Sequence, residues 1–194
     1  MSEAFFSLLV FVLLMVGTPG PANMLAMIGG ARLGLAPCVG FIAGLTIGKV
    51  GVNVLFGVGL GLLLAEQAGL LLALKLVSAA YLAWLAIRSW NPQAPDGRDS
   101  RKGLRFREGL IVHPLNTKAW VMSLLAWTQF APDLGDFWQQ MFVVCTTFAA
   151  CQIFTHTAWC YLGSVIGRAI PDSLILTRSL VVLTVGVVVW ALFQ

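Results

Sequence analysis

Apolar residues fill most of this chain in long stretches, and the polar residues collect between them. A helix needs about 20 apolar residues to cross the hydrocarbon core of a bilayer, and the sequence contains six stretches of about that length. They cover residues 4–28, 36–64, 68–90, 109–130, 137–166 and 174–193. The pattern therefore predicts an all-α polytopic membrane protein with six transmembrane helices.

Composition agrees with this pattern and argues against a soluble enzyme. Hydrophobic residues make up 59% of the 194 positions, charged residues make up 10%, and the mean hydropathy is +0.89, values far from those of soluble domains. Glu3, and no basic residue, precedes the first apolar stretch, so we expect this stretch to be a retained span and not a signal peptide. The sequence has no P-loop, dinucleotide fingerprint, H-E-x-x-H or G-x-S-x-G motif, and no enzymatic activity is expected.

The cysteines give no sign of a disulfide framework, a metal site or another cofactor site. All four lie in apolar stretches without a C-x-x-C pair, and free cysteines in such places are usually small packing residues. We therefore expect no metal and no cofactor.

Charge placement orients the chain across the membrane. Five of the twelve Lys and Arg residues lie in the loop 91–108, which is where a cytoplasmic connector would carry them, and this placement argues against nucleic-acid binding. Arg32, Arg168 and Arg178 fall on the same side of the predicted spans, whereas the loops on the other side carry acidic residues and no basic ones. Both termini are therefore predicted to lie outside the cytoplasm.

The polar loop divides the chain into an N-terminal half, 1–90, a basic cytoplasmic linker, 91–108, and a C-terminal half, 109–194. Each half holds three predicted spans, and halves with an odd number of spans must lie in opposite senses if they share a fold. Each half also opens with a proline-broken segment that contains Pro-x-Asn, at Pro21 to Asn23 and at Pro114 to Asn116. The sequence thus favours two inverted three-helix repeats, although matches of three residues also arise by chance.

The segment Thr18-Pro19-Gly20-Pro21 is the stronger of the two interruptions. Two prolines fix the backbone, glycine permits unusual angles, and the Thr18 hydroxyl is able to satisfy a freed carbonyl. A helix that restarts after this turn, near Asn23, would present free N–H groups that suit the carboxylate of a small zwitterion. The alternative interpretation is a packing kink with no solute.

The chain resembles the lysine exporter and homoserine/threonine resistance (LysE/RhtB) family of bacterial amino-acid efflux proteins almost from end to end. The resemblance rests on T-P-G-P at 18–21, on Gly40-x-x-x-Gly44-x-x-x-Gly48, on the segment from Lys75 to Leu85, and on Asn116-Thr117-Lys118-Ala119 closing at Gln129-Phe130. It implies an amino-acid exporter of the bacterial cytoplasmic (inner) membrane. Two positions depart from the family pattern, because Lys49 stands where an acidic residue is common and Thr117 stands where proline is usual.

Lysine and asparagine residues within the spans are the candidate solute ligands. Thr46, Lys49 and Asn53 form one polar stripe on the second span, and a lysine inside a bundle should face a partner or water. Lys49 would repel a cation and favour a carboxylate, or else its side chain would snorkel to the interface. Lys118 and Asn116 at the second break complete the candidate set, together with Thr18, Pro19, Gly20, Pro21 and Asn23 at the first.

No Asp or Glu lies deep within a predicted span, so a carboxylate proton relay is not expected. His156, with an ordinary pKa of about 6.5, is the candidate for proton coupling, and Gln152 lies one helical turn before it. A histidine that is simply hydrogen-bonded within the bundle is the alternative. His113 is predicted to lie at the cytoplasmic interface.

The sequence therefore favours a secondary transporter that exports a small polar solute, an amino acid or a derivative, by alternating access. The expected partners are this solute and the lipid bilayer, and the glycine-lined helix faces are compatible with a homodimer. A channel-like ion pathway and a non-transporting membrane assembly factor of the same fold remain as alternatives.

Overall fold

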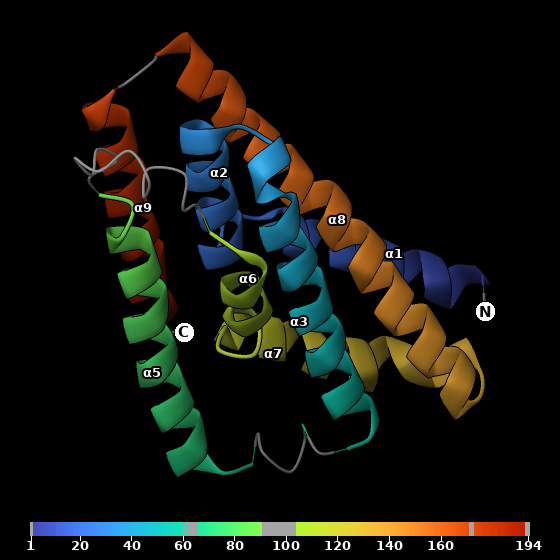
Figure 1. The fold of residues 1–194 in the computed structure, drawn as a ribbon. Helices are drawn as coiled ribbons and strands as arrows, with labels where there is room; N and C mark the ends of the chain where they lie inside the picture. The colour runs from blue at the N-terminus through green and yellow to red at the C-terminus, as the bar shows by residue number, and fades with distance from the viewer. Residues whose placement is uncertain (1, 60, 62–65, 91–103, 171–172, 193–194) are drawn as a thin grey trace.

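A computed structural model describes residues 2–59, 61, 66–90, 104–170 and 173–192, and within them the chain is helical with no strand. Most of the predicted linker, residues 91–103, lies outside the described residues, as does the end of the second predicted span. Figure 1 shows the described helices as a tilted bundle in which α8 and α3 run along one side and α5 and α9 lie together on the other. The predicted all-α class is confirmed.

The first broken segment is a pair of helices joined by a sharp bend. Helix α1 spans Ser2–Gly17 and α2 spans Pro21–Leu33, and the angle between the two is 57°. Pro21 begins α2, where its missing N–H costs nothing, and Gly20 precedes it in an extended conformation with φ −163°. The sequence therefore stops and restarts the helix at the predicted place.

The second broken segment has the same plan. Helix α6, Phe106–Val112, ends before Pro114, and α7, Thr117–Leu125, begins after Asn116. A π-helical turn, η2 (Ala126–Phe130), and a 3-10 turn, η3 (Ala131–Leu134), follow α7. In Figure 1, α6 lies beside α3 and below α2, and α7 runs behind α3.

Each broken pair packs on a long helix from the opposite half of the chain. After the short 3-10 turn η1 (Ala36–Cys38) come α3, Val39–Gly57, and α5, Ala68–Ile87; the second half continues with α8, Phe137–Ala169, and α9, Leu174–Leu192. Helices α1 and α2 pack on α8, whereas α6 packs on α3. The order of broken pair, long helix and further helix thus occurs twice along the chain.

Glycines let these helices meet backbone to backbone. A Cβ atom on Gly44 or Gly48 would overlap the carbonyls of Phe106 and Leu110 in α6, and one on Gly30 of α2 would overlap the carbonyl of Cys160 in α8. Gly44 and Gly48, the last two members of the glycine motif at 40–48, thus let α3 and α6 pack closely.

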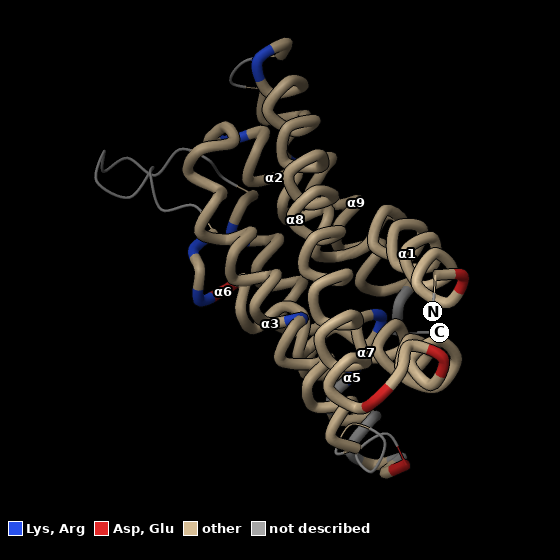
Figure 2. The backbone as a smooth tube through the Cα atoms, turned by 90° about the vertical axis from the view of Figure 1, so that its right-hand side faces the viewer, with Lys and Arg blue, Asp and Glu red and all other residues tan. Residues whose placement is uncertain are grey.

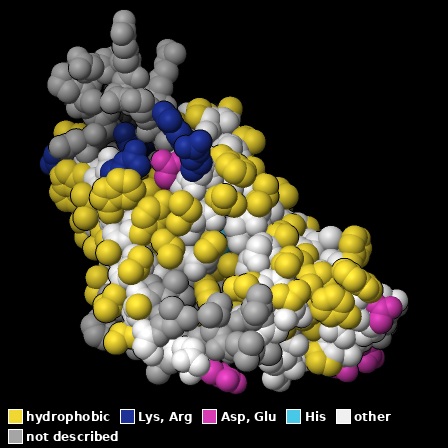
Figure 3. Space-filling model, turned by 60° about the horizontal axis from the view of Figure 1, so that its bottom comes forward, with side chains coloured by type: hydrophobic (Ala, Val, Ile, Leu, Met, Phe, Trp, Pro, Cys, Tyr) yellow, Lys and Arg dark blue, Asp and Glu magenta, His cyan; other side chains and the backbone are white. Residues whose placement is uncertain are grey.

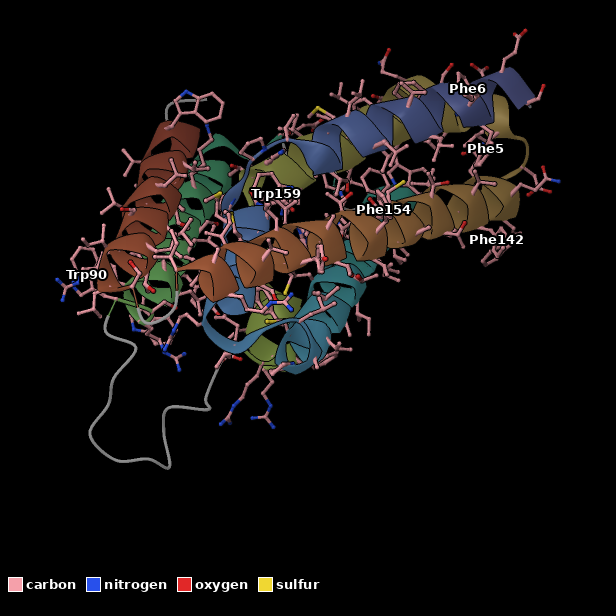
Figure 4. The ribbon with its side chains drawn as sticks, turned by 90° about the horizontal axis from the view of Figure 1, so that it is seen from above. Phe5, Phe6, Trp90, Phe142, Phe154 and Trp159 are labelled. Atoms are coloured by element: carbon pink, nitrogen blue, oxygen red, sulfur yellow. The ribbon has the colours of Figure 1, made fainter. Side chains whose placement is uncertain are left out.

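Large apolar side chains cover much of the outer surface, as expected for a chain surrounded by lipid. Phe5 and Phe6 of α1 and Phe142 and Phe154 of α8 are exposed, and Figure 4 labels them along these two neighbouring helices. Figure 3 shows hydrophobic side chains over most of the described surface on one face. Figures 2 and 3 show most of the described Lys and Arg toward one end of the molecule and most Asp and Glu toward the other, and Figure 2 also shows basic residues in α3 and α7.

Fewer helices meet the length of a span than the six that the sequence predicts. Among the described residues, Ala36–Gly57 and Phe137–Ala169 are long and apolar enough to cross a membrane, and the bent pair α1 and α2 would form a third span. The apolar parts of α5 and α9, Lys75–Ile87 and Leu174–Trp190, are shorter. The chain has the helices of a membrane protein, and the six-span count and the inverted repeat stay predictions.

Candidate functional site

Side chains repair the hydrogen bonds that the first break removes from the end of α1. The amide Nδ2 of Asn23 donates to the carbonyls of Val16 and Thr18, at 2.7 and 2.9 Å, and the indole Nε1 of Trp159 donates to the carbonyl of Gly17 at 3.2 Å. The last carbonyls of a helix have no partner within it, and lipid supplies none. These bonds therefore hold the unwound turn in a fixed shape.

The second break is held in a similar way. The side-chain Oδ1 of Asn116 caps α7 by accepting the backbone N–H of Lys118 at 3.1 Å, and the indole of Trp120 donates to the carbonyl of Pro114 at 2.9 Å. This cap starts α7 so that Lys118, in its first turn, reaches the first break.

Lys118 joins the two breaks directly. Its Nζ donates to the hydroxyl of Thr18 at 2.7 Å and to the carbonyl of Thr18 at 3.2 Å. Gly20 makes room for this lysine, because a Cβ atom there would lie 3.3 Å from Nζ. Two unwound segments about a hundred residues apart in sequence therefore lie against each other.

A small polar cavity lies where the breaks meet. Its volume is about 20 Å³, enough for about one water molecule and too small for an amino acid. The residues that line it are Met15, Val16, Gly20, Ala22, Asn23, His113, Asn116, Lys118, Met122, Gln152 and His156. None of these is acidic, and Lys118 is the only lysine or arginine among them.

Several buried polar atoms around this cavity have no hydrogen-bond partner among the described residues. They are Oδ1 of Asn23, both ring nitrogens of His113, both amide atoms of Gln152 and Nδ1 of His156. Leaving one such atom unpaired costs about 1–3 kcal/mol, and native proteins rarely cluster them without a use. The concentration of unpaired donors and acceptors at one cavity indicates a place for a polar ligand.

His113 lies in the interior, so its predicted position at the cytoplasmic interface is wrong. Its side chain is 2% exposed, and its ring centroid lies 5.6 Å from that of His156 in α8. The interface prediction placed His113 by its position near the start of the predicted span 109–130, whereas α6 packs on α3 and brings His113 beside His156 of α8. The adjacent Pro114, which marks the break, was the sequence signal that could have identified it.

Lys49 and Asn53 are buried away from the residues that line the cavity. Lys49 is 0% exposed, its Nζ donates to the carbonyl of Ala119 at 2.7 Å and to Ser123 Oγ at 2.5 Å, and it lies 4.3 Å from the ring centroid of Phe148. Ser123 in turn donates to Oδ1 of Asn53 at 2.6 Å. This network ties α3 to α7, and Ser123 is a member that the sequence did not single out.

The remaining predicted residues, Thr18, Pro19 and Pro21, do not line this cavity. Pro21 lines a second cavity of about 20 Å³ with Asn116, Thr117, Lys75 and further residues of α5 and α9, so Asn116 lines both cavities. Thr18 and Pro19 are exposed. The structure thus brings together Gly20, Asn23, Asn116, Lys118, Gln152 and His156 at one cavity, with Thr18 bonded to Lys118 at its edge.

Two discontinuous helix pairs that meet at a polar cavity, inside a bundle with an apolar exterior, are typical of membrane transporters. Comparison with known proteins places the chain within this class. The family model "LysE type translocator" matches residues 12–192, and the chain belongs to this family. The resemblance seen in the sequence motifs is thereby confirmed, and since the members of the family are transporters, the expected absence of enzymatic activity is consistent with it.

The individual relatives share 25–30% of the aligned residues with this chain. An uncharacterized membrane protein of Vibrio cholerae serotype O1 is 30% identical over 168 residues, which cover 82% of this chain and 80% of the relative. Cysteine/O-acetylserine efflux proteins of Salmonella paratyphi A and Salmonella typhimurium are each 25% identical over 160 residues, which cover 82% of both chains. No solved structure matches the chain.

Proposed function

We propose that this translocator is a secondary exporter that carries a small amino acid, or an amino-acid derivative, out of the cell through the cavity between its two helix breaks. The observation that carries this proposal is the direct contact of the breaks through Lys118 and Thr18 beside a cluster of unpaired polar atoms. Family membership supports the class of transport. The names of the Salmonella relatives make cysteine and O-acetylserine the first solutes to test.

The cavity supplies both partners that a zwitterion needs. Lys118 offers an ammonium to the solute carboxylate, and α2 begins at the same place, so its first N–H groups and the positive end of its dipole favour the same anionic group. The unpaired oxygens of Asn23 and Gln152 are acceptors for the solute ammonium. Asn116 holds the first turn of α7 and thereby positions Lys118.

Transport requires the bundle to open, because the cavity of about 20 Å³ is smaller than any amino acid. The packing suggests which parts move: one broken pair lies on α8 and the other on α3. In an inverted repeat, rocking of the unit formed by α1, α2 and α8 against the unit formed by α3, α6 and α7 would expose the cavity first to the cytoplasm and then to the outside. The buried network of Lys49, Ser123 and Asn53 would keep α7 attached to α3 during this motion.

Proton coupling is assigned to the histidine beside the cavity. His156 and Gln152 lie one turn apart on α8, and His113 contacts His156 from the second break. A proton bound to His156 or His113 would lie in the same cavity as Lys118 and the solute ammonium. Like charges so close together disfavour each other. The release of solute and the uptake of a proton would therefore be linked.

The charge distribution supports the predicted orientation. The end of the molecule that carries Arg32 and Arg168 would face the cytoplasm, and the end with Glu3, Asp133 and Asp136 would face outward (Figure 2). In this orientation in the bacterial inner membrane, the N-terminus would lie outside the cytoplasm.

Counterflow in proteoliposomes tests the proposed function. Vesicles loaded with an unlabelled amino acid should take up the labelled solute transiently and saturably, with cysteine, O-acetyl-L-serine, homoserine, threonine and lysine as the test panel. The absence of saturable counterflow for every solute on the panel would contradict the proposal. A channel would instead give flux that rises linearly with concentration and shows no counterflow.

A further inference from the structure

A larger cavity lies at the basic end of the molecule, apart from the central one. Its volume is about 770 Å³, within the range of sites for small ligands. It is formed by the end of α2, the turn that leads to η1, and the last turns of α8. The residues that line it are Gly30, Ala31, Arg32, Leu33, Gly34, Leu35, Ala36, Pro37, Tyr161, Ser164, Gly167 and Arg168.

Two arginines from different helices give this cavity its chemistry. Arg32 lies in the last turn of α2 and Arg168 in the last turn of α8. The Nε of Arg168 donates to the carbonyl of Ser164 at 3.3 Å, whereas the buried Nε of Arg32 has no partner among the described residues. None of the residues that line the cavity is acidic. Guanidinium groups recognise carboxylates and phosphates through paired hydrogen bonds, so the cavity suits an oxyanion.

Helix α8 connects this cavity to the central one. Gln152, His156, Cys160, Ser164 and Arg168 are spaced four residues apart, so each lies next to the following one along the helix. The first two line the central cavity and the last two line the arginine cavity.

A tight contact between α2 and α8 separates the two cavities. A Cβ atom on Gly30 would overlap the carbonyl of Cys160, and one on Gly163 would overlap the carbonyl of Met27. The backbones of the two helices therefore touch between the cavities. In this conformation the contact between α2 and α8 closes the central cavity toward the basic end of the molecule.

We propose that Arg32 and Arg168 form a cytoplasmic capture site that binds the carboxylate of the exported solute before the contact between α2 and α8 opens. This inference rests on the proposed function, and it assigns the arginine cavity as the entrance of the export route. The same two helices line both the entrance and the central cavity, which favours the solute over a lipid phosphate as the occupant. Positive charge at the entrance also raises the local concentration of anionic groups.

Uptake into inside-out membrane vesicles tests the capture site, because their cytoplasmic face is directed outward. With labelled O-acetyl-L-serine as the probe, the double variant R32Q/R168Q should raise KM about tenfold, the loss expected for one charge-assisted hydrogen bond, and leave kcat unchanged. The KM measured from the opposite face in right-side-out vesicles should stay the same. Added salt should raise the KM of the wild type more than that of the double variant, because salt screens the arginines.

The matched control is R105Q/R107Q, which removes the same charge from the same end of the molecule but outside the cavity. An equal rise in KM for this control, or an unchanged KM for R32Q/R168Q, would overturn the capture site while wild-type transport upholds the proposed function. If the wild type transports none of the panel, both proposals fail. A further experiment compares the KM of the wild type and R32Q/R168Q in vesicles of phosphatidylcholine with and without phosphatidylglycerol. If the effect of R32Q/R168Q appears only with the anionic lipid, the cavity binds a lipid phosphate and the inference is wrong.

Discussion

Replacing Lys118 by methionine removes the cation that joins the two helix breaks while keeping a long side chain in place. Among the residues that the structure describes, its Nζ bonds only to the exposed Thr18, whose carbonyl also accepts a bond from Asn23. Water is able to replace an exposed bond of this kind, so the free energy of unfolding should fall by about 1 kcal/mol or less. With solute bound, the loss should be larger, because a hydrogen bond from a charged donor to a carboxylate contributes about 1.5–3 kcal/mol.

The expected result of K118M is therefore a KM about 10- to 100-fold higher with nearly unchanged stability. Counterflow of O-acetyl-L-serine in proteoliposomes gives KM, and thermal unfolding in detergent gives stability.

The same substitution at Lys49 provides the control. Lys49 is fully buried, it does not line the cavity, and its loss leaves the carbonyl of Ala119 and the hydroxyl of Ser123 without their donor. K49M should therefore lower stability, by about 1–3 kcal/mol for an unpaired buried acceptor, and leave KM close to that of the wild type. If K49M raised KM as strongly as K118M, Lys49 would meet the solute and the assignment of Lys118 as the carboxylate partner would be refuted.

Three further substitutions test other parts of the structure. Gly30→Ala should destabilise the protein by about 1–3 kcal/mol, because the new methyl group overlaps the carbonyl of Cys160, whereas Gly186→Ala, which meets no atom within 4 Å, should not; equal unfolding temperatures would argue against the close α2–α8 contact. Trp159→Phe should lower stability by about 1 kcal/mol through the loss of its bond to the last carbonyl of α1, and an unchanged unfolding temperature would contradict that bond. His156→Gln should abolish export driven by a proton gradient and retain counterflow, which moves no net protons; gradient-driven export at the wild-type rate would place coupling elsewhere.

The two interruptions could be predicted from sequence because proline and glycine act locally. Pro21 and Pro114 cannot continue a helix, whatever surrounds them, and the structure breaks at both. Asn23 and Asn116 were predicted as solute ligands from their place beside these prolines, and in the structure their side chains bond to the backbone around the breaks. The family motifs added the class of protein, which periodicity alone does not supply.

The contacts between distant segments could not be predicted, because they depend on how the helices pack. The bond between Lys118 and Thr18 joins residues a hundred positions apart, and that between Trp159 and Gly17 joins residues still farther apart. Lys49 shows the same limit. Its polar stripe indicated that it should meet a partner or water, but only the packing of α3 on α7 identified that partner as Ala119 and Ser123.

The accessibility of a cysteine placed in the central cavity tests most directly whether this cavity is the transport site. Met122→Cys, in a background that lacks the four native cysteines, puts a thiol on the cavity wall. Membrane-impermeant thiol reagents should modify it from either side of the membrane, and a transported solute should slow the reaction from both. A thiol that reacts from neither side, or at a rate that the solute does not change, would show that the junction of the breaks is closed packing and not a pathway.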